Sequence, residues 1–519
     1  MVEKTMVAVG VMTMPAAAES PSTADDGDVL SSRPSGGDEA LALVIAWCSD
    51  EPWRAGEVAW LPRGRPGETR VFGRGGALED DPHPRLTFVR QRPWGPEAAG
   101  PLLLPALSRV QLLASSIGLD RIAVRNVGRC ALLVGGNPVE TASLSPGQSA
   151  QLGRQILLLC VRRSVVLPAP DDAYPVGSFG AADGLGMVGE SVAAWRLRQQ
   201  LAIVGPRSGH VLLLGPSGCG KELCARGLHA LSARRGRRLV ARNAATIPDS
   251  LVDVELFGHA RGYPSHGMPE RLGLVGEADE STLFLDEIGE VPLTSQAHLL
   301  RLLDGGEYHR LGESVARTAN LRIVAATNRD PSQLKCDLLA RFPYRIQIPG
   351  FEARVEDVPL LARHLLRHLA AADPLLERAA GVESSRRDGG GRPLETSISL
   401  CRQLVERSYT GHFRELERLL LQSFVDAGGG EIQKLPAVAE LPAFAAAVAN
   451  AADDASSVAA SLAPARIQAV LDAHNGHIES AARALGLKNR FALGRLISKY
   501  GLEVRRRRSS RAKARPAGH

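Results

Sequence analysis

Residues 277–288 read E-A-D-E-S-T-L-F-L-D-E-I, and this stretch predicts the architecture of the middle of the chain. The apolar run Leu283-Phe284-Leu285 ends directly in two carboxylates, Asp286 and Glu287. A short continuous apolar run is typical of a strand that is buried on both faces of a parallel sheet. Such a strand can deliver a metal-binding Asp and a water-activating Glu to a phosphate site.

The surrounding sequence alternates between strands and helices. Val211–Leu214 and Ile323–Ala326 are further short apolar runs that fit central parallel strands, whereas residues 222–231 and 295–303 have helical spacing. We therefore expect an α/β domain over residues 184–350 and a helical part over residues 351–440. Residues 382–395 indicate a polar surface insertion in that helical part.

A glycine-rich motif follows the first of these strands and opens a helix. It consists of Gly215, Pro216, Ser217, Gly218, Cys219, Gly220, Lys221 and Glu222. Glycines let backbone N–H groups surround phosphates, and the helix N-terminus adds its dipole. An ordinary glycine-rich turn is the alternative, but the Asp286-Glu287 pair on a second strand argues against it.

The chemistry of such a site follows from the residue types. Lys221 would reach the outer phosphates of ATP, and Asp286 would hold Mg²⁺ directly or through water. Glu287 would orient and deprotonate the attacking water. Asn328, just after the strand Ile323–Ala326, is placed to sense the γ-phosphate, although it could equally be a simple strand-end cap.

Composition bounds the rest of the chain. Its 519 residues are too many for one core, and the 44% hydrophobic and 23% charged fractions are those of a soluble globular protein. Seven scattered cysteines without C-x-x-C spacing predict reduced thiols in the cytoplasm. No apolar run approaches the ~18 residues that cross a bilayer, and no secretory signal or membrane partner is expected.

The flanking segments differ in composition from the centre. We expect a disordered tail over residues 1–39, an all-β sandwich over 40–164 and a Pro/Gly-rich linker over 165–183. A second linker over 441–462 precedes a short helical unit over 463–503 and a basic tail over 504–519. That tail has six Arg, one Lys and no acid from Arg505 onward, which favours nucleic acid or is simply a solvated tail.

The central motifs together resemble the AAA+ domain of bacterial enhancer-binding proteins, the activators of sigma-54 RNA polymerase. The resemblance covers about residues 188–425. It includes G-P-S-G-C-G-K-E, V-E-L-F-G-H, E-A-D-E-S-T-L-F-L-D-E-I-G-E-V-P, V-A-A-T-N-R-D and S-Y-T-G-H-F-R-E-L. It also accounts for Glu222, because the family commonly has Glu after the lysine.

The resemblance implies a homo-oligomeric ring, usually a hexamer, with ATP at each subunit boundary. It makes Asn243 the residue that holds Glu287, and it puts Arg414 in the sensor position of the helical lid. The arginine positions that act on a neighbouring subunit fall on Lys335 and Arg341. Lys keeps the charge but lacks the planar fork of Arg, so we expect slower hydrolysis.

The family's G-A-F-T-G-A loop, which contacts sigma-54, is altered here. The register closes without a gap, so the loop is Gly262, Tyr263, Pro264, Ser265, His266 and Gly267. Pro replaces Phe and Ser replaces Thr. Proline cannot stack like an aromatic ring, although Tyr263 provides an aromatic ring one residue earlier.

The N-terminal sandwich resembles a forkhead-associated domain, which binds phosphothreonine. The resemblance rests on Gly73-Arg74, residues 107–111, Gly135-Gly136 and residues 144–148. Arg74 and Arg109 could pair a phosphate and Ser108 could hydrogen-bond it, which implies a phosphorylated protein partner. The alternative is a degenerate sandwich that serves only packing or dimer contacts.

The C-terminal unit resembles a Fis-type helix-turn-helix. Leu493, Leu496, Ile497 and Tyr500 form one apolar stripe of its last helix. The polar residues left to face double-stranded DNA are Lys488, Asn489, Arg490, Arg495 and Lys499. A small helical oligomerisation unit is the alternative.

These predictions combine into an ATP-hydrolysing, DNA-binding transcription regulator of the sigma-54 activator type. One alternative keeps the fold but loses sigma-54 activation, because of the G-Y-P-S-H-G loop. Another alternative, a metabolic P-loop kinase or transferase, has no visible substrate site in the sequence.

Overall fold

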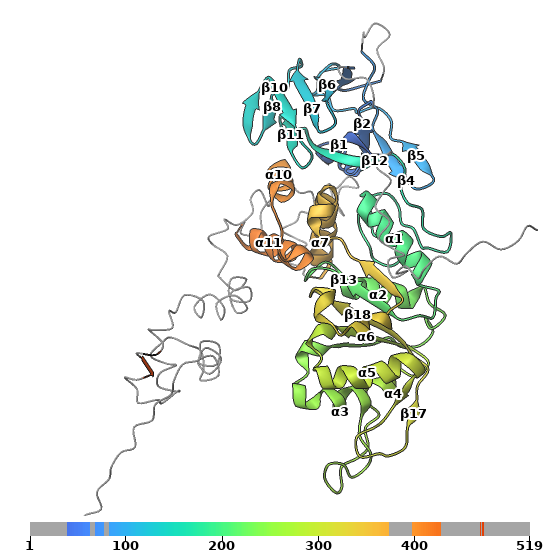
Figure 1. Ribbon diagram of the computed structural model, residues 1–519. Helices are drawn as coiled ribbons and strands as arrows, with labels where there is room; N and C mark the ends of the chain where they lie inside the picture. The colour runs from blue at the N-terminus through green and yellow to red at the C-terminus, as the bar shows by residue number, and fades with distance from the viewer. Residues whose placement is uncertain are drawn as a thin grey trace, which may run out of the picture. The chain divides into compact units, whose positions relative to one another are not determined.

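The computed structural model describes residues 39–62, 68–76, 83–372 and 397–426, together with residues 468, 470 and 471. The chain divides into two compact units, Met1–Leu435 and Pro436–His519, and every helix and strand named below lies in the first (Figure 1). Among the described residues, no helix is both long enough and apolar enough to cross a bilayer.

The N-terminal region is a β-sandwich, as the alternating pattern predicts. One sheet has the strand order β5-β4-β2-β1-β12-β11-β8-β9, and the other has the order β10-β7-β6-β3. Inward-facing residues of both sheets, among them Ile45, Leu112 and Leu158, share one buried core. The strands are β1 (Glu39–Cys48), β2 (Val58–Trp60), β3 (Arg70–Phe72), β4 (Val89–Arg92), β5 (Gly95–Ala98), β6 (Leu112–Ile117), β7 (Arg121–Asn126), β8 (Leu132–Val134), β9 (Asn137–Val139), β10 (Thr141–Leu144), β11 (Ser149–Leu152) and β12 (Ile156–Ser164).

The centre of the chain is a parallel five-stranded sheet with the order β14-β15-β18-β13-β19. The strands are β13 (Val211–Leu214), β14 (Val240–Asn243), β15 (Thr282–Asp286), β18 (Arg322–Thr327) and β19 (Tyr344–Gln347). The predicted strands 211–214, 283–285 and 323–326 are therefore confirmed. A separate short hairpin pairs β16 (Glu307–Tyr308) with β17 (Arg317–Thr318).

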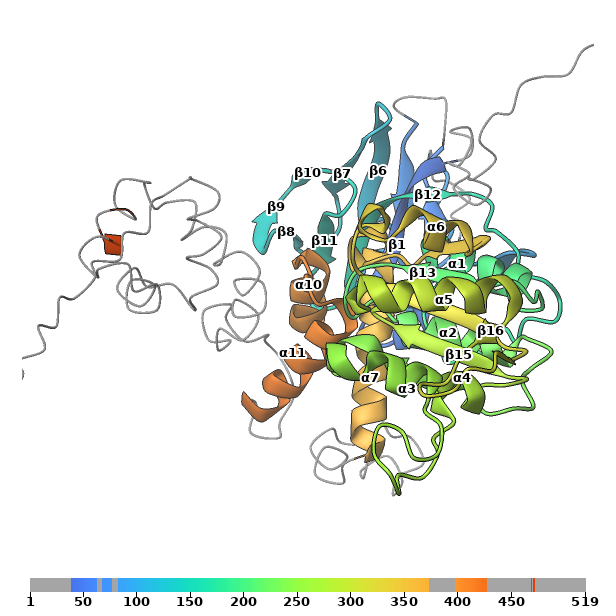
Figure 2. The ribbon, with the colours of Figure 1, turned by 60° about the horizontal axis from the view of Figure 1, so that its bottom comes forward.

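Helices cover both faces of this sheet, which explains its uninterrupted apolar runs. Leu283 and Leu285 share a core with α3 (Val252–Phe257), α4 (Gly273–Glu277) and α5 (Leu293–Gly305). Phe284, which points to the other face, packs with α1 (Val192–Val204) and α2 (Lys221–Ala230). Figure 2 shows α3 and α5 beside β15. A strand buried on both sides needs apolar residues at every position.

A helical region follows the sheet and consists of α7 (Val358–Ala372), α10 (Ile398–Glu406) and α11 (His412–Asp426), whereas the short helix α6 (Cys336–Ala340) lies between β18 and β19. The predicted insertion over residues 382–395 lies outside the described residues. Helix α10 packs its apolar face against the sandwich, where Ile398, Cys401 and Val405 share a core with Ala42 and Val44 of β1.

The segment between β12 and α1, predicted as a Pro/Gly-rich linker, is held by side-chain contacts. Tyr174 is 4% exposed, and its hydroxyl donates to Asp183 Oδ2 at 2.9 Å. The backbone N–H of Gly180 donates to Glu190 at 2.7 Å. This segment is therefore part of the packed structure between the sandwich and the central sheet.

Candidate nucleotide site

The candidate site lies where the parallel strands of the central sheet end. Asn243 and Asp286 are the last residues of β14 and β15, and they are direct partners in the sheet register. Asn328 follows the last residue of β18, and Gly215 follows the last residue of β13. Parallel strands end at one edge, so four residues that are far apart in the sequence meet there, as expected at the ligand-binding edge of an open α/β sheet.

The glycine-rich loop turns sharply between β13 and α2. Gly218 has φ +75°, and a Cβ atom on it would lie only 2.4 Å from the carbonyl oxygen of Gly411. Lys221 is 7% exposed, and its Nζ donates to the carbonyls of Gly215 at 3.1 Å and Pro216 at 3.2 Å. Glu222 points outward and pairs with Arg226 at 2.6 Å along the helix. It is therefore a surface residue of α2.

The two carboxylates have different partners. Asn243 Nδ2 donates to Asp286 Oδ2 at 3.4 Å, whereas the backbone N–H of Asn328 donates to Glu287 Oε2 at 3.3 Å. Lys221 Nζ lies 3.8 Å from Glu287 Oε1. We expected Asn243 to hold Glu287, but the register pairs it with Asp286. Glu287 instead turns away from the strand at φ +53°, so it faces β18 and the lysine.

The N-terminus of α11 closes the site from the other side. The backbone N–H of Phe413 donates to the carbonyl of Gly218 at 3.0 Å. Arg414 donates to Ser217 Oγ at 3.2 Å, so the residue predicted for the sensor position contacts the glycine-rich loop. This contact joins the helical region to the phosphate-type loop.

An apolar pocket adjoins the loop and was not predicted from the sequence. Met187, Leu223, Leu361 and Phe413 line it, together with the side chains of Arg198, Arg354 and Cys224. Burial raises the pKa of the Cys224 thiol to about 12, which keeps this part of the wall uncharged at neutral pH. The pocket thus lies directly beside the phosphate-type loop, with mostly apolar walls.

The two residues expected to act on a neighbouring subunit lie around α6. Lys335 Nζ donates to the carbonyl of Leu293 at 2.8 Å, and Arg341 forms an ion pair with Asp304. Both contacts join α6 to α5. Neither residue makes a described hydrogen bond or ion pair with the glycine-rich loop of its own chain.

Comparison with known proteins places this site in a family. Residues 187–348 match the model of the sigma-54 interaction domain. The transcriptional regulatory protein ZraR of Salmonella typhimurium is 34% identical over 325 residues, which are 61% of this chain and 69% of ZraR. The anaerobic nitric oxide reductase transcription regulator NorR of Serratia proteamaculans is 31% identical over 394 residues, which are 71% of this chain and 73% of NorR.

The chain belongs to the sigma-54-dependent transcriptional regulator family. Its central sheet, with the helices packed on it up to residue 348, is the AAA+ sigma-54 activation domain. Some relatives are much longer: the chain spans 44% of the formate hydrogenlyase transcriptional activator of Salmonella typhimurium, with 34% identity over 323 residues that are 60% of this chain.

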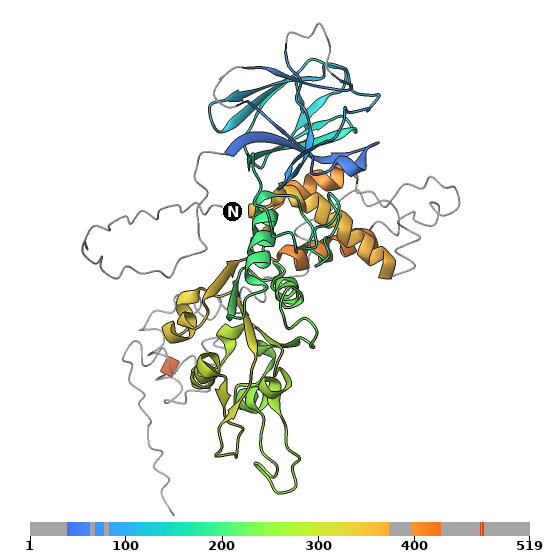
Figure 3. The same ribbon diagram turned by 90° about the vertical axis from the view of Figure 1, so that its right-hand side faces the viewer.

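Within this sigma-54 activation domain, residues 262–267 form a loop between α3 and α4 that extends away from the sheet (Figure 3). His259 and Arg271 pair their backbones at the base of the loop. Tyr263 is 39% exposed, and its ring packs against Gly312. A Cβ atom on Gly312 would lie only 2.6 Å from a carbon of that ring. Gly312 precedes β17, so the aromatic ring of the first loop rests on a second loop.

The tip residues Pro264, Ser265 and His266 are exposed. Met268 and Val315 are exposed nearby, at 42% and 66%. The two loops thus expose three large apolar or aromatic side chains, Tyr263, Met268 and Val315.

The sandwich brings its predicted phosphate-binding residues together at one end. Arg74 N–H donates to the carbonyl of Ser108 at 3.0 Å, and a Cβ atom on Gly73 would lie 2.1 Å from the carbonyl oxygen of Arg109. Ser108 Oγ accepts a hydrogen bond from Arg129 N at 2.9 Å. Arg74, Ser108 and Arg109 therefore form one cluster with a further basic residue.

Two residues of this cluster were missed in the sequence. Arg85 donates to the carbonyls of Gly73 at 3.1 Å and Arg109 at 2.7 Å. Gln111 is fully buried and donates to Asn126 Oδ1 at 2.7 Å. Gln111 also donates to the carbonyl of Cys130 at 2.9 Å. It thus joins the segment before β6 to the loop between β7 and β8.

The residues predicted to contact DNA, Lys488, Asn489, Arg490, Arg495 and Lys499, lie outside the described residues.

Proposed function

We propose that this family member hydrolyses ATP and uses the energy to remodel sigma-54 RNA polymerase. The observation that carries the proposal is the meeting of the glycine-rich loop, Asp286, Glu287 and Arg414 at one edge of the sheet. These groups are the phosphate cradle, the metal-binding carboxylate, the base and the lid arginine of an ATPase.

The residues present fit ATP with Mg²⁺. Asp286 offers a carboxylate oxygen at the strand end, and oxygen is the ligand that Mg²⁺ prefers, with phosphates completing the set. The bound metal would neutralise charge on the phosphates. The pocket lined by Met187, Leu361 and Phe413 would hold the adenine base, and Lys221 would leave its loop carbonyls for the outer phosphates.

Glu287 is the proposed general base for hydrolysis. It is held by the N–H of Asn328 and lies close to Lys221, so the carboxylate stays oriented toward the position of the γ-phosphate. It would take a proton from the attacking water. Asn243 would act on Asp286 rather than directly on Glu287, because its amide is hydrogen-bonded to that carboxylate.

Turnover would need a ring, and an isolated chain would not hydrolyse ATP efficiently, because the remaining cations come from a neighbouring subunit. Arg341 would exchange its ion pair with Asp304 for the γ-phosphate of an adjacent subunit, and Lys335 would add a second charge. Such arginines act by stabilising charge in the transition state. The ring, a hexamer in the family it resembles, is part of the proposal.

The remaining roles concern input and output. Tyr263 and its exposed neighbours would contact sigma-54, the cluster around Arg74 would bind a phosphothreonine peptide, and residues 488–499 would bind double-stranded DNA. Support for the peptide site comes from the clustering of arginines with Ser108, because charge-assisted bonds are what a phosphate requires.

The decisive experiment traps the purified full chain with ADP and a γ-phosphate transition-state mimic and measures binding to sigma-54 by gel filtration. We expect a stable complex that ADP alone does not support. If ATP is hydrolysed but no complex forms, the chain is instead a nucleotide-responsive DNA-binding regulator that has lost sigma-54 activation. If ATP is neither bound nor hydrolysed, the whole proposal is wrong.

A further inference from the structure

Two buried arginines of the sandwich reach into the AAA+ domain. Arg163 of β12 is 2% exposed, and each of its guanidinium nitrogens has a separate partner. Nε donates to Gln91 Oε1 at 2.6 Å, one terminal nitrogen donates to Glu356 Oε1 at 2.9 Å, and the other donates to the carbonyl of Glu190. Glu356 precedes α7, and Glu190 precedes α1. Arg163 therefore joins the start of α7, in the helical region, to the segment that precedes α1.

The second arginine, Arg92 of β4, reinforces the Glu190 side. Its guanidinium carbon lies 5.3 Å from the ring centre of Phe179 and 5.6 Å from that of Trp195. Its Nη1 donates to Glu190 Oε2 at 3.4 Å, and the same oxygen accepts from Trp195 Nε1 at 3.2 Å. We call Arg92 and Arg163 the arginine clamp.

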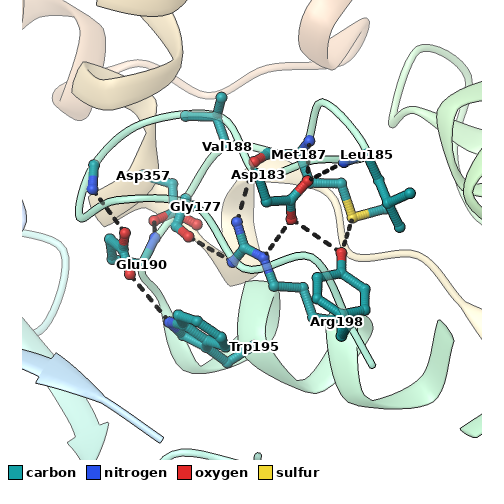
Figure 4. Close-up of polar contacts among 12 residues, drawn as sticks. Gly177, Asp183, Leu185, Met187, Val188, Glu190, Trp195, Arg198 and Asp357 are labelled. Atoms are coloured by element: carbon teal, nitrogen blue, oxygen red, sulfur yellow. Dashed lines mark hydrogen bonds and ion pairs between the residues drawn. The ribbon is translucent and has the colours of Figure 1, made fainter. Parts of the chain in front are cut away.

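Further polar contacts lead from Glu190 toward the wall of the nucleotide pocket, and Figure 4 shows those around Glu190, Asp357 and Arg198. Asp357, next to Glu356, accepts from the backbone N–H groups of Glu190 at 2.7 Å and Ser191 at 2.9 Å. Arg198 donates to the carbonyls of Gly189 at 2.7 Å and Met187 at 3.1 Å. Met187 and Arg198 line the pocket themselves. A series of hydrogen bonds and ion pairs thus connects Arg163 to the pocket proposed for the adenine base.

The contact between the sandwich and the helical region would not need buried charged residues if its role were only to hold the two parts together. The apolar contact between α10 and β1 already buries residues such as Val44 and Cys401 between the same two parts. Burying charged groups is costly unless every group is paired and hydrogen-bonded. Burial raises the pKa of Glu356 and of Glu190, while Arg163 and Arg92 respectively act against that shift. Directional charged contacts fix one geometry more tightly than an apolar contact does.

We propose that Arg163 and Arg92 are positioning residues of the nucleotide site, holding the lid and the pocket wall in one fixed relation. Resting on the proposed nucleotide function, this inference makes nucleotide affinity depend on the docked sandwich. Any ligand that shifts the sandwich would then change the pocket through Glu356 and Glu190, and nucleotide would in turn change the affinity of that ligand.

The test compares Arg163→Gln with Arg162→Gln in the full chain. Arg162 is the adjacent residue of β12, but it points outward and pairs with Asp120 of the sandwich. Isothermal titration with ADP should show a Kd about tenfold higher for R163Q and within about twofold of the wild type for R162Q. R163K keeps the charge but can make fewer directional bonds, so its Kd should lie between those of the wild type and R163Q.

A purely structural role for Arg163 would reduce the active fraction, and therefore kcat, without changing KM for ATP or Kd for ADP. An unchanged Kd in R163Q, or an equal rise in R162Q, overturns the inference. If the wild type binds no ADP, the proposed function fails, and hydrogen exchange still tests the clamp. The amides of Glu190 and Ser191 should exchange faster in R163Q than in R162Q, and equal protection would refute it.

Discussion

The carboxyl edge of the central sheet and the loop that contains Tyr263 lie close together in the sequence but are held very differently. Phe284 and Leu285 are 3% and 1% exposed, with helices on both faces of their strand. Tyr263 and Met268 are 39% and 42% exposed and rest on another loop. A substitution in β15 would disturb the helices on both faces of the sheet. At the exposed loop tip, a substitution can change the side chain without changing the backbone.

The largest expected effect comes from replacing the proposed general base, Glu287, at the sheet edge. Glu287→Gln should lower ATP turnover about 10²- to 10⁴-fold, because the amide cannot take a proton from water. ADP affinity should be retained, since Glu287 is close in size to Gln and the glycine-rich loop is untouched. The matched control is Glu290→Gln, which removes only an ion pair with Arg329. Turnover that is equal in both variants would remove Glu287 from the role of base.

The same small change at two glycines sharpens the comparison. Gly218→Ala would place a methyl group against the Gly411 carbonyl at φ +75°, so α11 could not approach the loop. We expect ADP affinity to fall about tenfold or more, as a loss of ~1.4 kcal/mol implies. Gly267→Ala has a similar φ of +92° but no atom within 4 Å.

Gly267→Ala should therefore cost only the backbone strain, about 1–2 kcal/mol, with ADP affinity unchanged. Calorimetric titration gives the affinities and thermal unfolding gives the stabilities. Equal losses of ADP affinity in the two variants would show that the contact between Gly218 and Gly411 has no part in nucleotide binding.

The loop can be altered without touching the sheet edge. In Gly312→Ala, the new methyl group would overlap the ring of Tyr263 at about the distance of 2.6 Å found for a built Cβ. Tyr263 must then move, and amide hydrogen exchange over residues 259–272 should become several-fold faster, while basal ATP turnover stays within about twofold. Gly305→Ala is the control, because nothing lies within 4 Å of its Cβ. Unchanged exchange in G312A would show that Tyr263 does not depend on the second loop.

The two regions also differ in how far the sequence predicts them. The strands 211–214, 283–285 and 323–326 could be located because burial on both faces leaves an uninterrupted apolar run, and their polar ends meet by the geometry of a parallel sheet. Arg414 contacts Ser217 of the glycine-rich loop, and its sensor role, which the family resemblance implied, stays a prediction. Asn243 hydrogen-bonds to Asp286, its partner in the strand register, and its predicted role on Glu287 stays a prediction.

Other features depend on contacts between distant segments and leave no local pattern. Arg85 and Gln111 look like ordinary polar residues until the loops of the sandwich meet around them. Arg163 follows Arg162 in an unremarkable pair, and only the packing of the two domains separates the buried residue from the exposed one. The seat of Tyr263 on Gly312 likewise joins two loops that are far apart in the sequence.

The smallest expected effect is a pH dependence of stability at the start of α11, which closes the site opposite the sheet edge. His412, at the start of α11, is 3% exposed, and its Nδ1 accepts a hydrogen bond from Phe351 N–H at 3.2 Å. Burial lowers the pKa of His412 below its usual 6.5, with Glu352 opposing the shift. The unfolded chain therefore binds more protons than the folded chain just below pH 6.5.

This contribution to the free energy of unfolding should be complete above pH 6.5 and be lost as the pH falls from 6.5 through the lower folded pKa. His412→Asn should flatten that acid slope relative to the wild type, because asparagine does not titrate, tolerates the residue's φ of +45° and offers an acceptor oxygen. His266→Asn, in the exposed loop, is the matched control and should leave the slope as it is. Denaturant unfolding at a series of pH values measures the slopes, and a slope in H412N as steep as in H266N would show that His412 does not titrate in this way.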